Sequence, residues 1–137
     1  MNNLYDIAKN CLGTRQTLDT SISSEVGCAE AVSSILHQAG VQIPSGGIPG
    51  TASLMAWLKT NPHFQVVSQW QAGDIIISST GSGNGKIPGH TGIMGNYGIM
   101  SNDSNTGLFL ELWTLPKWQK YYQQYGGMPI DFFRRIS

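Results

Sequence analysis

Residues 26–40 read VGCAEAVSSILHQAG, and this stretch predicts an amphipathic helix with a cysteine at its start. Apolar side chains at positions 32, 35, 36 and 39 follow the i, i+3, i+4, i+7 spacing of one helical face, and Gly40 is a typical C-terminal stop. Cys28 is therefore expected where the helix begins, and the helix dipole there favours a reactive thiolate. Because Cys28 also falls on the apolar face, a small buried core residue is the alternative interpretation.

Composition limits the kinds of partner that the chain can bind. Its 137 residues predict one domain, residues 1–137, and eight basic residues balance eight acidic ones. Only 12% of the residues are charged, which argues against a nucleic-acid interface or a basic membrane anchor. No apolar run is long enough to span a bilayer, and the N-terminus does not resemble a signal peptide. We therefore expect synthesis in the cytoplasm, with access to the cell wall or periplasm through lysis or a delivery machine.

The order of predicted elements gives the fold class. Helices are expected over residues 3–12, from Cys28 to Gly40, and from Thr51 to about residue 61, and residues 14–27 are expected to form a loop. Short runs rich in β-branched and aromatic residues predict strands at 64–67, 74–78, 91–95, 98–102, 108–113 and 130–136, with a short helix at 114–122. Helices followed by strands predict an α+β fold, in which the N-terminal helices cover one face of an antiparallel sheet.

A catalytic thiol needs a general base, and His90 is the best candidate among the three histidines. His37 lies nine residues beyond Cys28 on the same helix, about 13 Å away, and His63 follows a proline in a predicted loop. His90 opens a predicted strand, which is a rigid element that can present an imidazole to a helix packed on the sheet. A surface turn histidine is the alternative for His90.

The predicted hairpin that turns near residues 96–97 brings Ser101, Asn102 and Asp103 beside His90. Asn102 can orient the imidazole through its side-chain carbonyl, and Asp103 can do so as a carboxylate. Register decides between them, because successive strand residues face opposite sides. We favour Asn102 as the third residue of a triad with Cys28 and His90, and Asp103 is the alternative. For Ser101, Asn102 and Asp103 together, the alternative interpretation is an ordinary polar turn. The spacing of His and Cys residues predicts no metal site, and no cofactor is expected.

Three stretches carry a family resemblance: residues 27–32 (GCAEAV) opening a helix, 71–77 (QAGDIII) entering a strand, and 89–94 (GHTGIM) after a glycine-rich loop. In this order they resemble the NlpC/P60 and CHAP group of papain-like cell-wall cysteine peptidases. The resemblance covers residues from about 24 to 113. It implies a papain-like fold with N-terminal helices packed on an antiparallel sheet.

The resemblance also implies an activity. Members of this group cleave amide bonds of bacterial peptidoglycan, as endopeptidases or as N-acetylmuramoyl-L-alanine amidases. Carried over, Cys28 would be the nucleophile, His90 the base and Asn102 the orienting residue, and the Cys28 backbone N–H would help to hold the oxyanion. Two departures are visible. The Asp-Cys-Ser-Gly stretch common in NlpC/P60 members is Gly-Cys-Ala-Glu here, closer to CHAP sequences, and the Glu that CHAP domains often place after the histidine has no counterpart.

The resulting expectation is a monomeric peptidoglycan hydrolase of the phage-lysin (endolysin), virion-hydrolase or delivered-effector kind, with peptidoglycan as its partner. Two rivals stay open. One is a cysteine acyltransferase, transglutaminase or deamidase acting on proteins, and the other is a non-enzymatic wall-binding module. The aromatic residues between 113 and 125 are expected to pack on the sheet, with glycan contact as the alternative.

Overall fold

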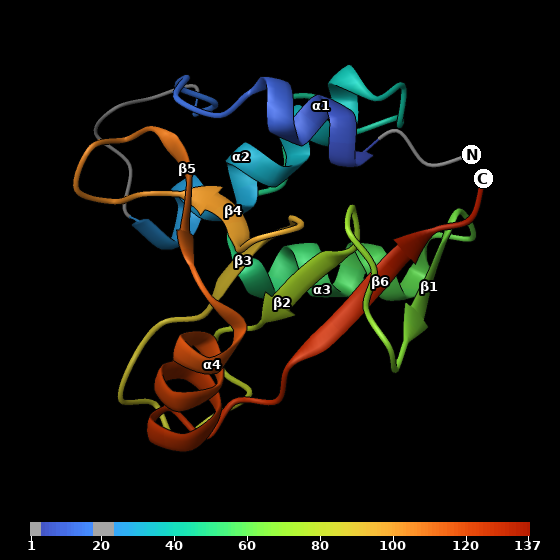
Figure 1. Ribbon diagram of the computed structural model, residues 1–137. Helices are drawn as coiled ribbons and strands as arrows, with labels where there is room; N and C mark the ends of the chain where they lie inside the picture. Colours follow the sequence, from blue (N-terminus) through green and yellow to red (C-terminus); the bar gives the residue numbers. More distant parts are fainter. Residues whose placement is uncertain (1–3, 18–23) are drawn as a thin grey trace.

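Six short strands form the framework of the protein, and helices flank them (Figure 1). The computed structural model describes residues 4–17 and 24–137. The helices are α1 (Leu4–Asn10), α2 (Ser24–Gln38), α3 (Thr51–Thr60), α4 (Leu115–Trp118) and the π-helix η1 (Gln119–Tyr125). The strands are β1 (Phe64–Val67), β2 (Ile75–Ser78), β3 (His90–Met94), β4 (Ile99–Asn102), β5 (Phe109–Trp113) and β6 (Asp131–Arg135).

The strands make one antiparallel sheet in the order β1-β6-β2-β3-β4-β5. From β2 to β5, neighbours in the sheet are neighbours in sequence, which is the meander expected of short hairpin connections. The last strand, β6, lies between β1 and β2. This arrangement confirms the predicted α+β class with an antiparallel sheet.

Strand β2 shows how the two faces of the sheet are used, because successive side chains point to opposite sides. Ile75 and Ile77 join the larger core, which is formed with α1, α2 and α3, whereas Ile76 joins a smaller core with Trp118 and Tyr122. All three isoleucines are fully buried, so both faces are covered. The N-terminal helices cover one face as predicted, and α4 with η1 adds a cover on the other.

The predicted start of the Cys28 helix was wrong by one turn. Helix α2 begins at Ser24, so residues 24–27, expected as loop, are helical. Residues 14–27 lack the apolar period from which the first turn of a helix can be predicted. Residue 3, the first of the predicted N-terminal helix, lies outside the described residues.

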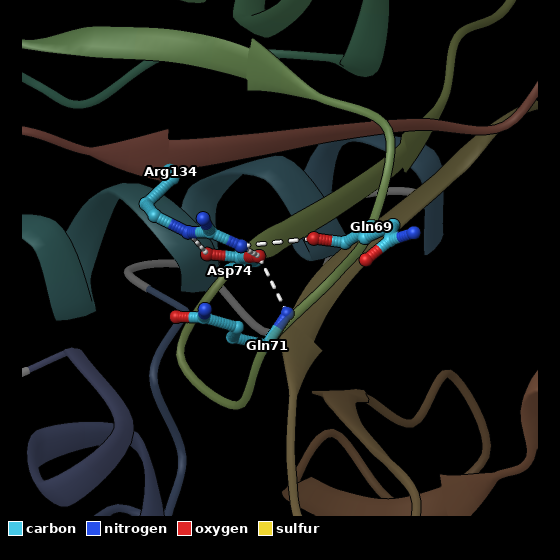
Figure 2. A network of polar contacts seen from close by, with 4 residues as sticks. All are labelled: Gln69, Gln71, Asp74 and Arg134. Carbon is cyan, nitrogen blue, oxygen red and sulfur yellow. Dashed lines mark hydrogen bonds and ion pairs between the residues drawn. The ribbon is translucent and has the colours of Figure 1, made fainter.

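An ion pair fixes the turn that leads into β2 (Figure 2). Asp74 is 1% exposed and lies 2.8 Å from Arg134 of β6, whose guanidinium donates to both carboxylate oxygens. Asp74 also accepts a hydrogen bond from the Gln71 N–H, and Arg134 donates to the Gln69 carbonyl. Asp74 in the 71–77 stretch therefore has a structural role, because its contact with Arg134 joins two neighbouring strands.

No helix in the part of the chain that the structure describes has the length and apolarity needed to cross a bilayer.

Candidate active site

A cavity of about 320 Å³ opens where β3 begins and β4 ends, at the end of the hairpin away from its turn. Three of the predicted site residues, His90, Asn102 and Asp103, line it. The other described lining residues are Pro88, Gly89, Ser104, Asn105, Trp113, Tyr121 and Tyr122. Among the described lining residues, the cavity thus combines one imidazole and two side-chain amides, those of Asn102 and Asn105, with a wall of aromatic rings.

His90 is buried among aromatic rings at the first position of β3. Its ring stacks on Trp118 and Tyr122, with centroids 5.1 and 5.7 Å away, and its Nε2 atom lies 3.1 Å from the hydroxyl of Ser101. Burial lowers the pKa of His90 from 6.5 to about 4, because a low-dielectric environment disfavours the charged imidazolium. His90 is therefore neutral at pH 7.

A neutral imidazole carries one proton, and the Ser101 hydroxyl can pair with Nε2 either as an acceptor or as a donor. With the proton on Nε2, this nitrogen donates to the Ser101 hydroxyl, and Nδ1 keeps the lone pair. Gly92 makes room for the contact, because a Cβ at this position would lie 3.0 Å from the Cβ of Ser101. In this tautomer Nδ1 is the atom able to accept a proton.

The prediction that Asn102 orients His90 was wrong in its contact. Ile93 pairs with Met100 and Met94 with Ile99, and continuing this register sets Asn102 opposite Thr91, which neighbours His90 and faces the other side of the sheet. Ser101 shares the face of His90, and its hydroxyl provides the hydrogen bond that was assigned to Asn102.

Asp103, the predicted alternative, is engaged elsewhere. Its Oδ2 atom accepts hydrogen bonds from the backbone N–H and the hydroxyl of Thr106. Such a side-chain contact within a turn is a common use of aspartate after a strand. Asp103 thus stabilises the β4–β5 turn. For this residue the structure agrees with the alternative interpretation, an ordinary polar turn.

The side chain of Asn102 instead lies between the cavity and helix α2. It is 7% exposed and lines the cavity. Its Oδ1 atom is buried and has no hydrogen-bond partner among the described residues. Its Nδ2 atom lies against Gly27, where an added Cβ would be 3.0 Å away. The amide group of Asn102 is therefore packed one residue from Cys28.

Cys28 is fully buried in the fifth position of α2. The first four N–H groups of a helix lack intrahelical acceptors, and the Cys28 N–H lies just beyond them in α2, a position that does not favour the oxyanion role expected for it. The favourable end of the dipole is likewise strongest in the preceding turn. Cys28 is not among the described residues that line the cavity.

Tyr122 connects Cys28 to the cavity. Burial raises the pKa of Tyr122, and the charge of a Cys28 thiolate raises it further. Tyr122 also stacks on His90 and lines the cavity. The geometric links are the stacking of Tyr122 on His90 and the packing of Gly27, the residue before Cys28, against the Asn102 amide.

The aromatic segment after β5 divides into a buried and an exposed part. Trp118 and Tyr122 belong to the core, and the Trp118 indole donates to the hydroxyl of Ser78. Tyr121 and Tyr125 are exposed, and their rings stack with centroids 5.9 Å apart. With Trp113, Lys117 and Lys120 they line an open groove that adjoins the His90 cavity through Trp113 and Tyr121.

Two residues of the site, Ser101 and Tyr122, were not predicted from the sequence. Ser101 was placed beside His90 without a role, although the predicted turn at 96–97 already implied that Ser101, and not Asn102, shares the face of His90. Tyr122 carried no such signal, because its contact with His90 joins the end of the chain to the start of β3. The chain matches no protein-family model and no curated protein.

Proposed function

We propose that the protein is a cysteine hydrolase that cleaves an amide bond of bacterial peptidoglycan, on a papain-like scaffold of the NlpC/P60-CHAP kind. The observation that carries the proposal is that His90 and Asn102 share one cavity, while Cys28 follows Gly27, which packs against the Asn102 amide. These residues come from α2, β3 and β4 and are separated by many residues in the sequence. Nucleophilic cleavage of an amide requires a nucleophile, a base and a group that orients the base, for which the thiol of Cys28, the neutral imidazole of His90 and the hydroxyl of Ser101 are the candidates.

In the proposed reaction, the thiol of Cys28 gives its proton to Nδ1 of His90, and the sulfur attacks the carbonyl carbon of the substrate amide. The imidazolium then protonates the leaving nitrogen, the C–N bond breaks, and a thioester remains on Cys28. Neutral His90 next removes a proton from water, which attacks the thioester and restores the thiol. As an acceptor from Nε2–H, the Ser101 hydroxyl holds the imidazole in the tautomer that this sequence needs.

The shape and charge of the region support a polymeric, weakly charged substrate. The cavity continues into the open groove lined by Trp113, Tyr121 and Tyr125, so a long chain fits better than a small free molecule. The charged side chains among the described groove residues are Lys117 and Lys120, and the chain has a formal net charge of zero, which suits a substrate recognised mainly by hydrogen bonds and ring contacts. Peptidoglycan, a glycan carrying short peptides, has these properties.

Purified sacculi provide the test of the activity. Wild-type protein, Cys28→Ala and Cys11→Ala are incubated with sacculi of several wall types, and released fragments are identified by mass spectrometry. Cys11 is the matched control because it is also a buried thiol, but it packs in the main core away from the cavity. We expect fragments from wild type and Cys11→Ala and none from Cys28→Ala. Absence of fragments with wild type on every wall type contradicts the proposal.

The full burial of Cys28 favours a second candidate, a wall-binding module in which Cys28 is a core residue. This candidate predicts that Cys28→Ala binds sacculi as wild type does, that no amide is cut, and that the Cys28 thiol does not react with iodoacetamide in the folded protein. A co-sedimentation assay and mass spectrometry of the alkylated protein therefore separate the two candidates.

A further inference from the structure

We propose that Asn102 binds the substrate, and that its Oδ1 atom accepts a hydrogen bond from a secondary amide N–H of the molecule held in the His90 cavity. The inference rests on the proposed function for the class of substrate. It assigns Asn102 a task different from the orientation of His90, which Ser101 already provides.

The state of the Asn102 side chain is the first observation. Asn102 is 7% exposed, and its buried Oδ1 atom has no hydrogen-bond partner among the residues that the structure describes. A buried carbonyl oxygen without a donor is destabilising, which is why such atoms are rare in folded proteins. In a residue that lines a cavity, the missing donor is naturally supplied by what the cavity binds.

The position of Asn102 is the second observation. Its Nδ2 atom is packed against Gly27, next to Cys28, and its side chain shares the cavity with His90. An N–H group held at Oδ1 therefore lies at the cavity that His90 also lines, next to the turn of α2 that carries Cys28. A hydrogen bond there fixes the substrate where the neighbouring carbonyl meets the thiol, and such positioning is a large part of catalysis.

The kind of donor follows from the surroundings. The cavity is also lined by aromatic rings, those of Trp113, Tyr121 and Tyr122, and the carboxylate of Asp103 accepts hydrogen bonds from its own turn. A planar, neutral amide fits such a lining better than an ammonium group, which would need a free carboxylate. In peptidoglycan, secondary amides occur both in the peptides and in the N-acetyl groups of the sugars.

Steady-state kinetics separates substrate binding from orientation of the base. We expect Asn102→Ala to raise KM about tenfold, the effect of losing one hydrogen bond of about 1.4 kcal/mol, and to leave the pH profile of kcat unchanged. Ser101→Ala, the matched neighbour on the opposite face of β4, is expected to lower kcat at nearly constant KM. If Asn102→Ala instead lowers kcat, moves the pH profile and spares KM, Asn102 orients His90 and the inference is wrong.

Binding to the inactive Cys28→Ala protein identifies the donor without any turnover. Calorimetry compares a sugar-free stem peptide, a peptide-free N-acetylated disaccharide, and the same peptide methylated in turn at each amide nitrogen. We expect one N-methylation to weaken peptide binding about tenfold, and to have no further effect in Cys28→Ala/Asn102→Ala. If the disaccharide alone shows the Asn102 dependence, the donor is an N-acetyl group. Equal binding of all ligands by both proteins overturns the inference.

The inference and the proposed function fail in different ways. If wild type cuts sacculi but Asn102→Ala keeps its KM and its ligand affinity, only the inference is overturned. If wild type cuts nothing and Cys28→Ala binds neither peptide nor disaccharide, the proposed function fails and the inference falls with it. If Asn102→Ala does not fold, the N-methylated peptides still test the inference. The proposed hydrogen bond is excluded if every N-methylated peptide binds Cys28→Ala as tightly as the unmethylated peptide does.

Discussion

The burial of a single side chain, His90, decides how the site responds to pH. Its pKa is lowered to about 4 by desolvation, so the neutral, proton-accepting form persists well below the usual range of histidine. We expect kcat/KM for a soluble muropeptide to fall on the acid side only as the pH drops through about 4. A profile measured from about pH 3 to 8 tests this prediction. An acid limb centred near the ordinary value of 6.5 would mean that His90 is solvated when it acts.

Gly27 provides a second prediction at the scale of one residue. Replacing a helical Gly by Ala usually stabilises a protein by about 1 kcal/mol, but here the new Cβ would lie 3.0 Å from the Asn102 amide. We expect Gly27→Ala to change the free energy of unfolding by less than about 1 kcal/mol, while KM rises because Asn102 is displaced. Urea denaturation and kinetics measure the two effects. A gain in stability with unchanged KM would show that Asn102 accommodates the methyl group.

At the scale of one residue, local chemistry in the sequence singles out candidates, and the roles of Cys28 and His90 stay predictions. Cys28 and His90 stand out because nucleophile and base chemistry needs few residue types. The sequence placed Asn102 in this region, but the predicted hydrogen bond between Asn102 and His90 was wrong. The side chain that reaches His90 is decided by alternation along β4, not by residue type. The orphaned Oδ1 atom of Asn102 has no signature in sequence at all, because it depends on packing against Gly27 from another element.

At the scale of elements, the Asp74–Arg134 pair joins β6 to the turn before β2 and offers a third prediction. Asp74→Asn removes the charge but keeps one acceptor, so we expect it to lower the free energy of unfolding by about 2 kcal/mol, the contribution of one hydrogen bond to a charged group. Arg134→Lys is expected to destabilise as well, because Lys cannot reproduce the two-pronged contact with both carboxylate oxygens. Urea unfolding provides the measurement. An Asp74→Asn protein as stable as wild type would show that the ion pair adds nothing beyond a neutral hydrogen bond.

The elements themselves were largely readable from periodicity and turn residues. All six predicted strands are present, and their ends differ from the prediction by at most one residue. The start of α2 was misplaced because residues 14–27 lack an apolar period that would show where the helix begins. The π-helical continuation of α4 was also unpredictable, since its wider hydrogen-bond spacing leaves no distinct sequence pattern. This element nonetheless carries Tyr122, whose ring stacks on His90.

For the molecule as a whole, the fold class followed from the order of elements, but the sheet order did not. The hairpins from β2 to β5 pair neighbours in sequence, which local turn signals can predict. Placing the last strand, β6, between β1 and β2 depends on contacts between the end of the chain and its middle. No local pattern encodes such pairing, and the Asp74–Arg134 contact that marks it is visible only in three dimensions.

The buried histidine also makes the stability of the whole molecule depend on pH. Between pH 6.5 and about 4 the unfolded chain binds a proton at His90 that the folded chain does not, so the free energy of unfolding must decrease as the pH falls through this window. A difference of two to three pKa units corresponds to about 3 kcal/mol. We expect His90→Gln to flatten this part of the profile, and His63→Gln, which removes an exposed histidine, serves as the control. Urea unfolding at a series of pH values measures the slope. If His90→Gln is as steep as wild type between pH 6.5 and 4, the acid sensitivity arises elsewhere and His90 is not held in its neutral form by burial.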